Sequence, residues 1–230
     1  MQADVTARYA IYFAPVPDSD LGRFGTRWFG DASAVEAALD EAIDRAYLAS
    51  VTSSPRHYGF HATLKAPFAL ADGRSESELR GAVQAFAARC APITAPPLEL
   101  TALHDFMALT LSAPSRAVDE LAADCVRAFE PFRAPLSPAM LERRRQAGLS
   151  ARQEHYLARW GYPYVMAEFR FHMTLSNRLD PTGQERLRRI LAPLLAPLEG
   201  QPLEIDGLAL FHQAEAAADF NVLERFRFSA

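Results

Sequence analysis

The chain has 230 residues, of which half are apolar and 23% are charged, an ordinary balance for a globular protein. That length allows one substantial core, or two small lobes that share one. The net charge of −4 argues against holding long nucleic acid by phosphate neutralisation alone, whereas a small phosphorylated ligand needs only a local basic pocket. The sequence shows no leader pattern and no apolar run near the ~20 residues of a membrane span, so we expect a cytoplasmic protein without membrane contact. The two cysteines, Cys90 and Cys125, are expected to be buried, reduced thiols.

The first half of the chain predicts alternating strands and helices. Residues 8–15 (RYAIYFAP) alternate and favour β structure, which predicts a strand. Residues 31–50 predict an amphipathic helix that needs a sheet to bury its apolar face. After the stretch RHYGFHATLKAPF (Arg56–Phe68), residues 75–90 predict a helix capped by Ser75, and residues 97–113 predict a hairpin. The apolar positions of the first helix are Val35, Leu39, Ile43 and Tyr47.

The second half repeats this order. A predicted helix, a strand containing FRFHMTL (Phe169–Leu175), a second helix and a final pair of strands follow one another. The tetrapeptides PLEL (Pro97–Leu100) and PLEI (Pro202–Ile205) fall at similar offsets beyond the two motifs that read His-x-Thr-Leu. A repeated order of elements together with matched motifs predicts an internal duplication and a single domain of two lobes over residues 1–230. The predicted elements of this half span residues 115–129, 168–176, 183–195, 202–211 and 220–228.

Residues 136–162 have no counterpart in the first half and predict two helices. Ser137 and Pro138 start the first, which Gly148 ends. Ser150 and Gln153 predict a capping box for the second. This helical insert is either a solvated surface element or a lid that reaches over the functional site. Its arginines are Arg143, Arg144, Arg145, Arg152 and Arg159.

The two matched motifs predict strands that present polar side chains on one face. With a period of two, residues 57–65 put His57, His61, Thr63 and Lys65 on one side and apolar side chains on the other. In the second motif Arg170, His172, Thr174 and Ser176 share one side. If the strands face a shared space, two imidazoles and two hydroxyls can surround one tetrahedral anion.

This set of groups suits in-line attack at phosphorus. One neutral histidine takes a proton from the nucleophile, and the other, protonated, gives a proton to the leaving oxygen. Imidazole is apt because its ordinary pKa of ~6.5 populates both forms near neutral pH. The threonine hydroxyls and nearby cations would hold the non-bridging oxygens as charge develops.

Three other interpretations compete with this one. His57 and His61 have the i, i+4 spacing of a zinc pair, but that geometry needs a helix, and Gly59 and the strand alternation argue against one. The histidines could instead be buried structural residues, which the duplicated motif disfavours. The sequence has neither a nucleophile elbow for a serine hydrolase nor a Gly-rich phosphate loop. His104, His155 and His212 fall outside the motifs and are expected in turns or on the surface.

The motifs HATL (His61–Leu64) and HMTL (His172–Leu175) resemble those of the 2H phosphoesterase superfamily, and their surroundings resemble a bacterial branch associated with phosphonate-utilisation operons. The resemblance covers essentially the whole chain. It implies an α+β fold of two duplicated lobes with antiparallel sheets around a central cleft and helices outside. It also implies a cyclic phosphodiesterase that needs neither metal nor cofactor.

Carried over to this sequence, the resemblance makes His61 and His172 the catalytic pair and Thr63 and Thr174 the phosphate ligands. We expect His172 to activate water and His61 to protonate the leaving oxygen, although the residues alone leave this order open. Further candidates for substrate binding are Lys65, Arg170, Tyr12 and Tyr58. The expected partner is a small cyclic phosphate on a sugar phosphate or nucleotide. Two alternatives remain: an RNA end-processing or RNA-binding protein that uses the same cleft, and a non-catalytic sensor of a phosphorylated metabolite.

Overall fold

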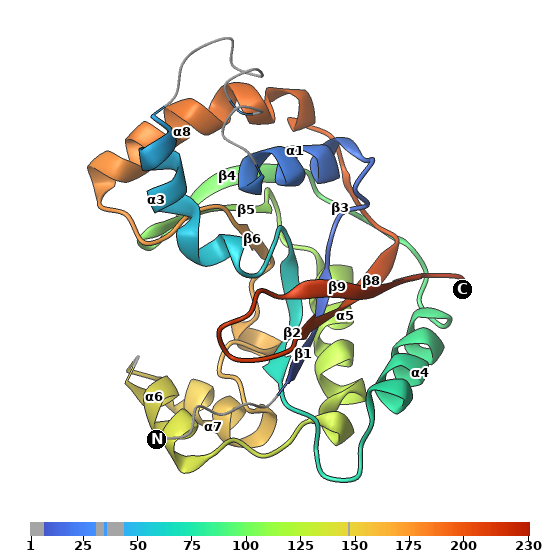
Figure 1. Ribbon diagram of the computed structural model, residues 1–230. Coiled ribbons are helices and arrows are strands. Elements are labelled where there is room, and N and C mark those ends of the chain that lie inside the picture. Colours follow the sequence, from blue (N-terminus) through green and yellow to red (C-terminus); the bar gives the residue numbers. More distant parts are fainter. Residues whose placement is uncertain (1–6, 31–34, 36–43, 147) are drawn as a thin grey trace.

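The structure, a computed structural model, describes residues 7–30, 35, 44–146 and 148–230 (Figure 1). In that part of the chain seven strands form one antiparallel sheet, and a separate two-stranded ribbon pairs β3 (Ile93–Ala95) with β7 (Leu203–Ile205). The predicted α+β class with antiparallel strands is confirmed. In spatial order the large sheet contains β4 (Leu98–Leu103), β5 (Phe106–Leu111), β6 (His172–Thr174), β2 (Ala62–Phe68), β1 (Arg8–Phe13), β8 (Gly207–Gln213) and β9 (Asn221–Arg227).

The sheet joins two groups of strands, and each group combines both halves of the sequence. Strands β1 and β2 from the first half pair with the hairpin β8–β9 from the second. Strand β6 from the second half pairs with the hairpin β4–β5 from the first. The repeated halves therefore exchange their hairpins, so neither half of the sequence makes a lobe by itself. The two groups meet between β2 and β6, where Ala62 pairs with Met173.

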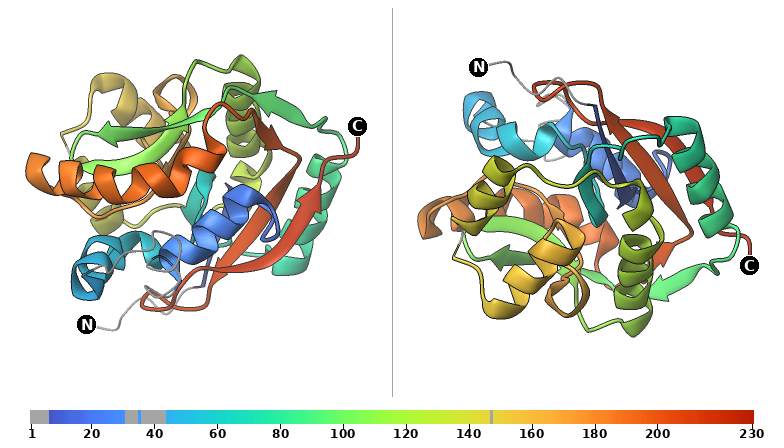
Figure 2. Two further views of the ribbon diagram at one scale, coloured as in Figure 1. Left: turned by 90° about the horizontal axis from the view of Figure 1, so that it is seen from above. Right: turned by 90° about the horizontal axis from the view of Figure 1, so that it is seen from below.

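Helices cover one face of the sheet and share one continuous core with it. Helices α4 (Glu76–Ala87) and α5 (Arg116–Ala128) contact the group that contains β2, β8 and β9, and α8 (Pro181–Leu195) contacts β4 and β5 (Figure 2). Helix α1 (Asp20–Phe29) inserts Trp28, whose indole nitrogen donates to the Leu175 carbonyl at 2.9 Å. That bond ties α1 to the end of the second motif. Buried side chains of this core include Leu79, Val118, Met107, Met173 and Leu187.

Local capping signals predicted where three helices begin, at the N-caps Ser75, Ser137 and Ser150. The capping boxes of Ser75 with Glu78 and of Ser150 with Gln153 are both formed. In the insert, α6 (Pro138–Arg145) and α7 (Ala151–Trp160) start and end as predicted, and Gly161 ends α7 in the left-handed conformation. Of the helix predicted over residues 31–50, residues 31–34 and 36–43 lie outside the described residues, and α3 (Arg45–Arg56) follows. Three short 3-10 turns are η1 (Glu130–Phe132), η2 (Met166–Glu168) and η3 (Ala196–Leu198).

Both motif strands are shorter than predicted. Helix α3 runs to Arg56, and Gly59 takes a φ of 69°, so the chain turns before β2 begins at Ala62. His57 lies in that turn and not on the strand face that the alternation predicted. Strand β6 contains only three residues, so Arg170 precedes it and is exposed, while Ser176 is buried and donates to the Asn177 carbonyl. The shared strand face is therefore confined to the residues nearest the two histidines.

Neither cysteine is in a disulfide; Cys125 is buried and Cys90 half-buried. None of the helices in the described ranges is both long and apolar enough to cross a membrane.

Candidate active site

The two motifs lie side by side on the central strands. Ala62 and Met173, which pair across β2 and β6, are buried in the core. Because side chains alternate along a strand, the residues on either side of this pair point to the opposite face of the sheet. Antiparallel register then places His61 across from Thr174 and Thr63 across from His172. These four side chains are half-buried and define what we call the site face.

Each histidine of the site face is held in the same way by its own chain. The Nδ1 atom of His61 lies 2.9 Å from the Gly59 carbonyl, and that of His172 lies 2.8 Å from the Arg170 carbonyl. In both motifs the acceptor is two residues before the histidine. A carbonyl can only accept, so Nδ1 carries the proton and Nε2 is left for chemistry. The two motifs therefore match in the orientation and tautomer of their histidine rings as well as in sequence.

Gly59 makes the first of these bonds available. With a φ of 69° it occupies the left-handed region, which glycine enters without the steric cost that other residues meet. This conformation reverses the chain between α3 and β2 and aims the Gly59 carbonyl at His61. Sequence reasoning used Gly59 only to argue against a helix and missed this contribution to the site.

Aromatic side chains support His61 from one side. The His61 ring stacks on Tyr12, with centroids 3.8 Å apart and an interplanar angle of 20°. Tyr12 is only 1% exposed, so it positions the imidazole and has almost no surface left for a ligand. The ring of Tyr58 lies 6.3 Å from that of His61 and stacks on Phe220 at 5.2 Å. Of the two tyrosines predicted to bind substrate, Tyr58 is therefore the one with accessible surface beside the site.

Hydroxyl groups complete the site face. Thr63 Oγ1 lies 3.3 Å from Nε2 of His61 and donates to it when that nitrogen is unprotonated. Thr174 lies at the corresponding place in β6, directly across from His61 by register. Directly opposite residues in an antiparallel pair have Cβ atoms ~5 Å apart. One tetrahedral anion between the strands is thus within reach of both hydroxyls and both Nε2 atoms.

Burial depresses the pKa of both histidines. Desolvation lowers the pKa of His61 from 6.5 to about 4, despite the hydrogen bond to the Gly59 carbonyl, which favours the charged ring. A charge on His172 lowers it further. The pKa of His172 is also lowered, again chiefly by desolvation. Because a proton on one ring disfavours a proton on the other, the pair holds one proton more readily than two.

Lys65 is not on the site face, which corrects the prediction from strand alternation. Thr63 pairs with Tyr12 and Lys65 pairs with Ile11, so Leu64 is an extra residue in β2, a β-bulge. Paired residues share a face, and Ile11 belongs to the core. The bulge therefore turns Lys65 away from His61 and Thr63. Its side chain is 3% exposed.

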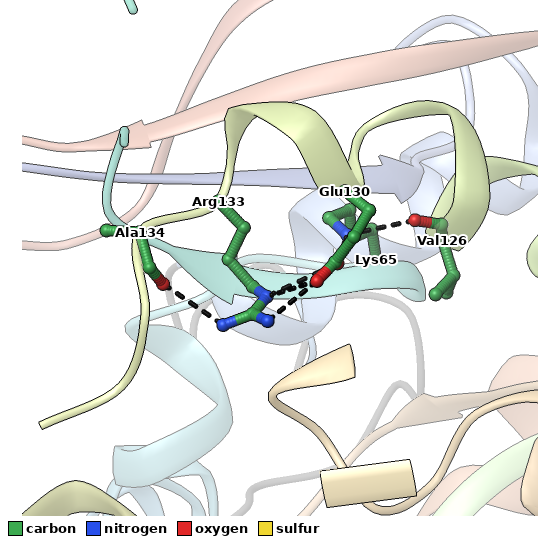
Figure 3. Close-up of polar contacts among 5 residues, drawn as sticks. All are labelled: Lys65, Val126, Glu130, Arg133 and Ala134. Carbon is green, nitrogen blue, oxygen red and sulfur yellow. Dashed lines mark hydrogen bonds and ion pairs between the residues drawn. The ribbon is translucent and has the colours of Figure 1, made fainter. Parts of the chain in front are cut away.

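The buried Lys65 ammonium is part of a structural network (Figure 3). It donates to the Val126 carbonyl at 3.1 Å and to Glu130 at 3.0 Å. Glu130 also accepts from the Arg133 guanidinium, at 2.6 Å from Nη2, and Arg133 donates through Nη1 to the Ala134 carbonyl. These contacts fasten β2 to the end of α5. Two cations share one carboxylate here, which leaves a net positive charge.

Arg170 and His57, which the sequence predicted on the same strand faces as the motif histidines, lie beside the site, and their side chains point elsewhere or to solvent. The exposed Arg170 contributes its backbone carbonyl to His172. His57 is exposed and its Nδ1 pairs with Asp219. Of the histidines outside the motifs, His104 and His155 are exposed, as predicted, and His212 is half-buried against Tyr9. In the part of the chain that the structure describes, no group of three or more His, Cys, Asp or Glu side chains could hold a metal ion.

Sequence reasoning did not single out two arginines that lie near residues supporting the site face. Arg8 lies on the same face of β1 as Tyr12, and Arg144 of α6 is close enough to Arg8 for their charges to interact. The sequence could have predicted the place of Arg8, because Arg8 and Tyr12 are four residues apart in β1 and therefore share a strand face. Nothing in the run Arg143 to Arg145 marks the middle residue.

Comparison with known proteins assigns the chain to a family. A family model described as "Protein of unknown function (DUF1045)" matches residues 63–221, which include the second motif and begin at Thr63.

The chain belongs to the DUF1045 family.

Relatives and solved structures extend this comparison. The "Ribose 1,5-bisphosphate phosphokinase PhnN" of Janthinobacterium sp. (strain Marseille) is 37% identical over 237 residues, covering 100% of this chain and 52% of the relative. The protein of the same name from Laribacter hongkongensis (strain HLHK9) is 37% identical over 222 residues, covering 94% and 50%. This DUF1045 chain thus spans about half the length of the curated relatives it matches. The structure of TT0787 from Thermus thermophilus aligns over 97% of this chain and 98% of its own, at 16% identity and with a TM-score of 0.45.

Proposed function

We propose that this protein is a phosphodiesterase that opens a cyclic phosphate on a small sugar phosphate or nucleotide, with His61 and His172 as its acid–base pair and without a metal. The observation that carries the proposal is that His61 and His172 are held by the same kind of hydrogen bond. Both Nδ1 atoms are bound to a carbonyl two residues back, and both Nε2 atoms are left on one face with a threonine opposite each ring. A pair of purely structural histidines would not need to turn the same nitrogen, Nε2, toward the same face in both motifs.

In the proposed reaction water attacks phosphorus opposite the oxygen that leaves. The general base accepts a proton from water at Nε2 while the new P–O bond forms. The general acid donates its Nε2 proton to the leaving oxygen as the old P–O bond breaks, which yields a phosphomonoester and a free hydroxyl. Thr63 and Thr174 donate hydrogen bonds to the non-bridging oxygens. General acid and general base contribute on the order of 10²–10⁴ each in rate.

The electrostatics favour His61 as the base, the reverse of the order expected from the resemblance. A pKa of about 4 keeps the His61 ring neutral at physiological pH. Its Nδ1–H is held by the Gly59 carbonyl, so Nε2 is the basic atom. His172, whose pKa is lowered without the added effect of a neighbouring cation, is then the ring that carries the shared proton.

The relatives support a sugar phosphate as the substrate class. Two of them are named for a kinase of ribose 1,5-bisphosphate, and this chain corresponds to about half of each. The sequence has no Gly-rich loop of the kind that holds nucleotide phosphates. We therefore assign kinase chemistry to the part of those relatives that this chain does not match, and cyclic phosphate chemistry to the part that it does. A place in phosphonate metabolism follows from the resemblance of the motif surroundings.

Turnover of a panel of cyclic phosphates in the presence of a chelator tests this function. The panel contains ribose cyclic phosphates and 2′,3′-cyclic nucleotides, and the readout is release of the phosphomonoester. We expect turnover by the wild type and a loss of at least 10³-fold in His61→Ala and in His172→Ala. His155→Ala, which removes an exposed histidine outside the motifs, is the matched control and keeps wild-type activity.

Each contrary result points to a definite alternative. Activity that requires added metal, or that survives both substitutions, would contradict the two-histidine mechanism. Absence of turnover together with a higher melting temperature in phosphorylated metabolites would favour the sensor. Oligonucleotide binding with a steep salt dependence would favour the RNA-directed function.

A further inference from the structure

Two arginines flank the site face without a carboxylate partner. In the described part of the chain, neither Arg8 nor Arg144 forms an ion pair with Asp or Glu, and both are half-buried. Two other arginines of the insert have carboxylate partners at the surface: Arg145 pairs with Glu154, and Arg152 pairs with Glu168. A half-buried guanidinium group loses part of the water that stabilises its charge. Without an opposite charge nearby, that loss is not compensated.

Arg8 is held in place through its Nε atom, which leaves its two terminal nitrogens available to a ligand. Its Nε donates to Gln213 Oε1 at 2.7 Å, and its guanidinium lies over the Phe220 ring at 5.4 Å. Phe220 in turn lies 6.4 Å from Tyr12, the residue on which His61 stacks. Within the described residues, the other two guanidinium nitrogens of Arg8 donate no hydrogen bond, so they can form the bidentate pair that arginine makes with phosphate.

Arg144 approaches the same region from α6. Its guanidinium lies 5.2 Å above the ring of Tyr162, the residue that follows α7 and Gly161. Tyr162 and Tyr58 both raise the pKa of the Tyr12 phenol, and Tyr58 raises that of Tyr162, so the three phenols lie near one another. Tyr162 also lines a small pocket together with Arg133 and with Lys65, whose side chain faces away from the site face (the latter two are drawn in Figure 3). Tyr162 and Arg8 both act electrostatically on Tyr12, and Arg8 acts on Arg144, so Arg144 and Tyr162 bring the insert close to the residue on which His61 stacks.

Like charges gather around Arg144. Desolvation lowers its pKa, and the positive charges of Arg8, Arg133 and Arg143 lower it further. The carboxylate of Glu130 is already shared by Lys65 and Arg133, so it does not neutralise this group. Repulsion among guanidinium groups costs free energy in the unliganded protein. A dianion placed between Arg8 and Arg144 would remove that cost.

We propose that Arg8 and Arg144 form an anion subsite beside the two histidines, which binds a second phosphate group, a phosphomonoester, on the substrate. This inference rests on the proposed function and decides between the two substrate classes that it leaves open. A cyclic nucleotide would place its uncharged base beside Arg8 and Arg144, and the charges of both arginines would then stay without a partner. A sugar that carries both a cyclic phosphate and a phosphomonoester satisfies the histidine pair and the arginine pair together.

The test compares matched substrates in matched variants. The substrates are a ribose cyclic phosphate with and without a phosphate on its 5-hydroxyl, and the readout is the ratio of their kcat/KM values. We expect this ratio to exceed ten in the wild type and to fall at least tenfold in Arg8→Gln and in Arg144→Gln. Arg143→Gln removes the same charge from an exposed neighbour on α6. Water and salt screen the exposed Arg143 charge, so the ratio in this variant should stay within about threefold of wild type. Arg144→Lys keeps the charge without the bidentate fork and gives an intermediate ratio.

A binding measurement separates this inference from the proposed function. Calorimetric titration with ribose 5-phosphate should show binding to the wild type and to Arg143→Gln, and at least tenfold weaker binding to Arg144→Gln. If cyclic phosphates are hydrolysed but Arg144→Gln and Arg143→Gln give the same substrate ratio, the subsite is wrong and the function stands. If no cyclic phosphate is hydrolysed but ribose 5-phosphate binding depends on Arg144, the function is wrong and the subsite stands. Melting temperatures of all variants verify that each is folded.

Discussion

The imidazole of His61 lies flat on the phenol ring of Tyr12, with ring centroids 3.8 Å apart. Tyr12 comes from β1 and His61 from the turn before β2, so the contact joins two segments about fifty residues apart in the chain. With the Gly59 carbonyl fixing Nδ1 and Tyr12 fixing the ring plane, the Nε2 atom of His61 has one preferred direction. In the proposed mechanism, the basicity and direction of this atom therefore depend on Gly59 and Tyr12, which take no part in the proton transfer.

Substitution of Tyr12 tests whether its ring or its hydroxyl matters. Tyr12→Phe keeps the stacking surface, so kcat/KM should stay within about threefold of wild type. Tyr12→Leu removes the flat surface under His61; we expect kcat to fall at least tenfold with little change in KM, and the free energy of unfolding to fall by roughly 2 kcal/mol. Steady-state kinetics and chemical denaturation measure both quantities. A raised KM in Tyr12→Phe would instead mean that the hydroxyl binds substrate, as the sequence suggested.

The same alanine substitution at Gly59 and at Gly73 tests whether the Gly59 conformation positions His61. Both glycines have a left-handed φ, 69° and 75°, and in neither case would an added Cβ lie closer than 3.9 Å to another residue. Gly59→Ala and Gly73→Ala should therefore lower the free energy of unfolding by similar amounts, about 1 kcal/mol. Only Gly59→Ala should reduce kcat, because Gly59, unlike Gly73, holds Nδ1 of His61, the proposed base. Equal activity of the two variants would show that this hydrogen bond does not position His61.

The parts of the fold that sequence reasoning predicted well are those that depend on neighbouring residues. The capping boxes of Ser75 and Ser150 need only a partner three residues away, so their helices begin where predicted. The core face of the second motif also followed from alternation, since Phe171, Met173 and Leu175 are all buried. The exchange of hairpins between the halves depends on which strands pair at long range, and no local pattern encodes that choice.

The same distinction explains which site residues were misplaced. Lys65 follows Thr63 at the correct strand period, but the extra residue Leu64 appears only when β2 is aligned with β1. Arg144 is one of three successive arginines, and its contact with Tyr162 depends on how α6 and α7 pack. Pairing and packing are tertiary properties, so the local sequence identified the chemical groups of the site without identifying all of their neighbours.

Lys65→Met tests the structural assignment of the buried ammonium. The substitution removes one cation from Glu130, but Arg133 keeps that carboxylate paired. The expected loss of unfolding free energy is thus about 1–3 kcal/mol, below the ~3–5 kcal/mol of a buried charge left without any partner. Because Lys65 faces away from His61, kcat/KM of the folded variant should match wild type. Unchanged stability with a large loss of kcat/KM would restore Lys65 as a substrate ligand.

The pH dependence of activity follows from the lowered pKa values. In the proposed mechanism the free protein needs a neutral base, His61 with a pKa of about 4, and a protonated acid, His172, whose pKa lies below 6.5. The optimum of kcat/KM should therefore lie between about pH 4 and 6.5, and kcat/KM should fall about tenfold per pH unit above that window. Far-UV circular dichroism at each pH verifies that the protein stays folded. An optimum above pH 8 would contradict a histidine acid.

The stability of the protein should depend on pH through His61. In the unfolded chain the ring becomes protonated as the pH falls through 6.5, whereas in the folded protein burial delays protonation to about pH 4. Between these values the unfolded state binds more protons, so the free energy of unfolding falls with decreasing pH, by at most about 3 kcal/mol in total. Above pH 6.5 the ring is neutral in both states and contributes no pH dependence. Urea denaturation of wild type, His61→Gln and the exposed control His155→Gln from pH 8 to 4 measures this effect. The wild type and His155→Gln should lose more stability than His61→Gln over that range, and parallel curves for all three would show that His61 is not held neutral by burial.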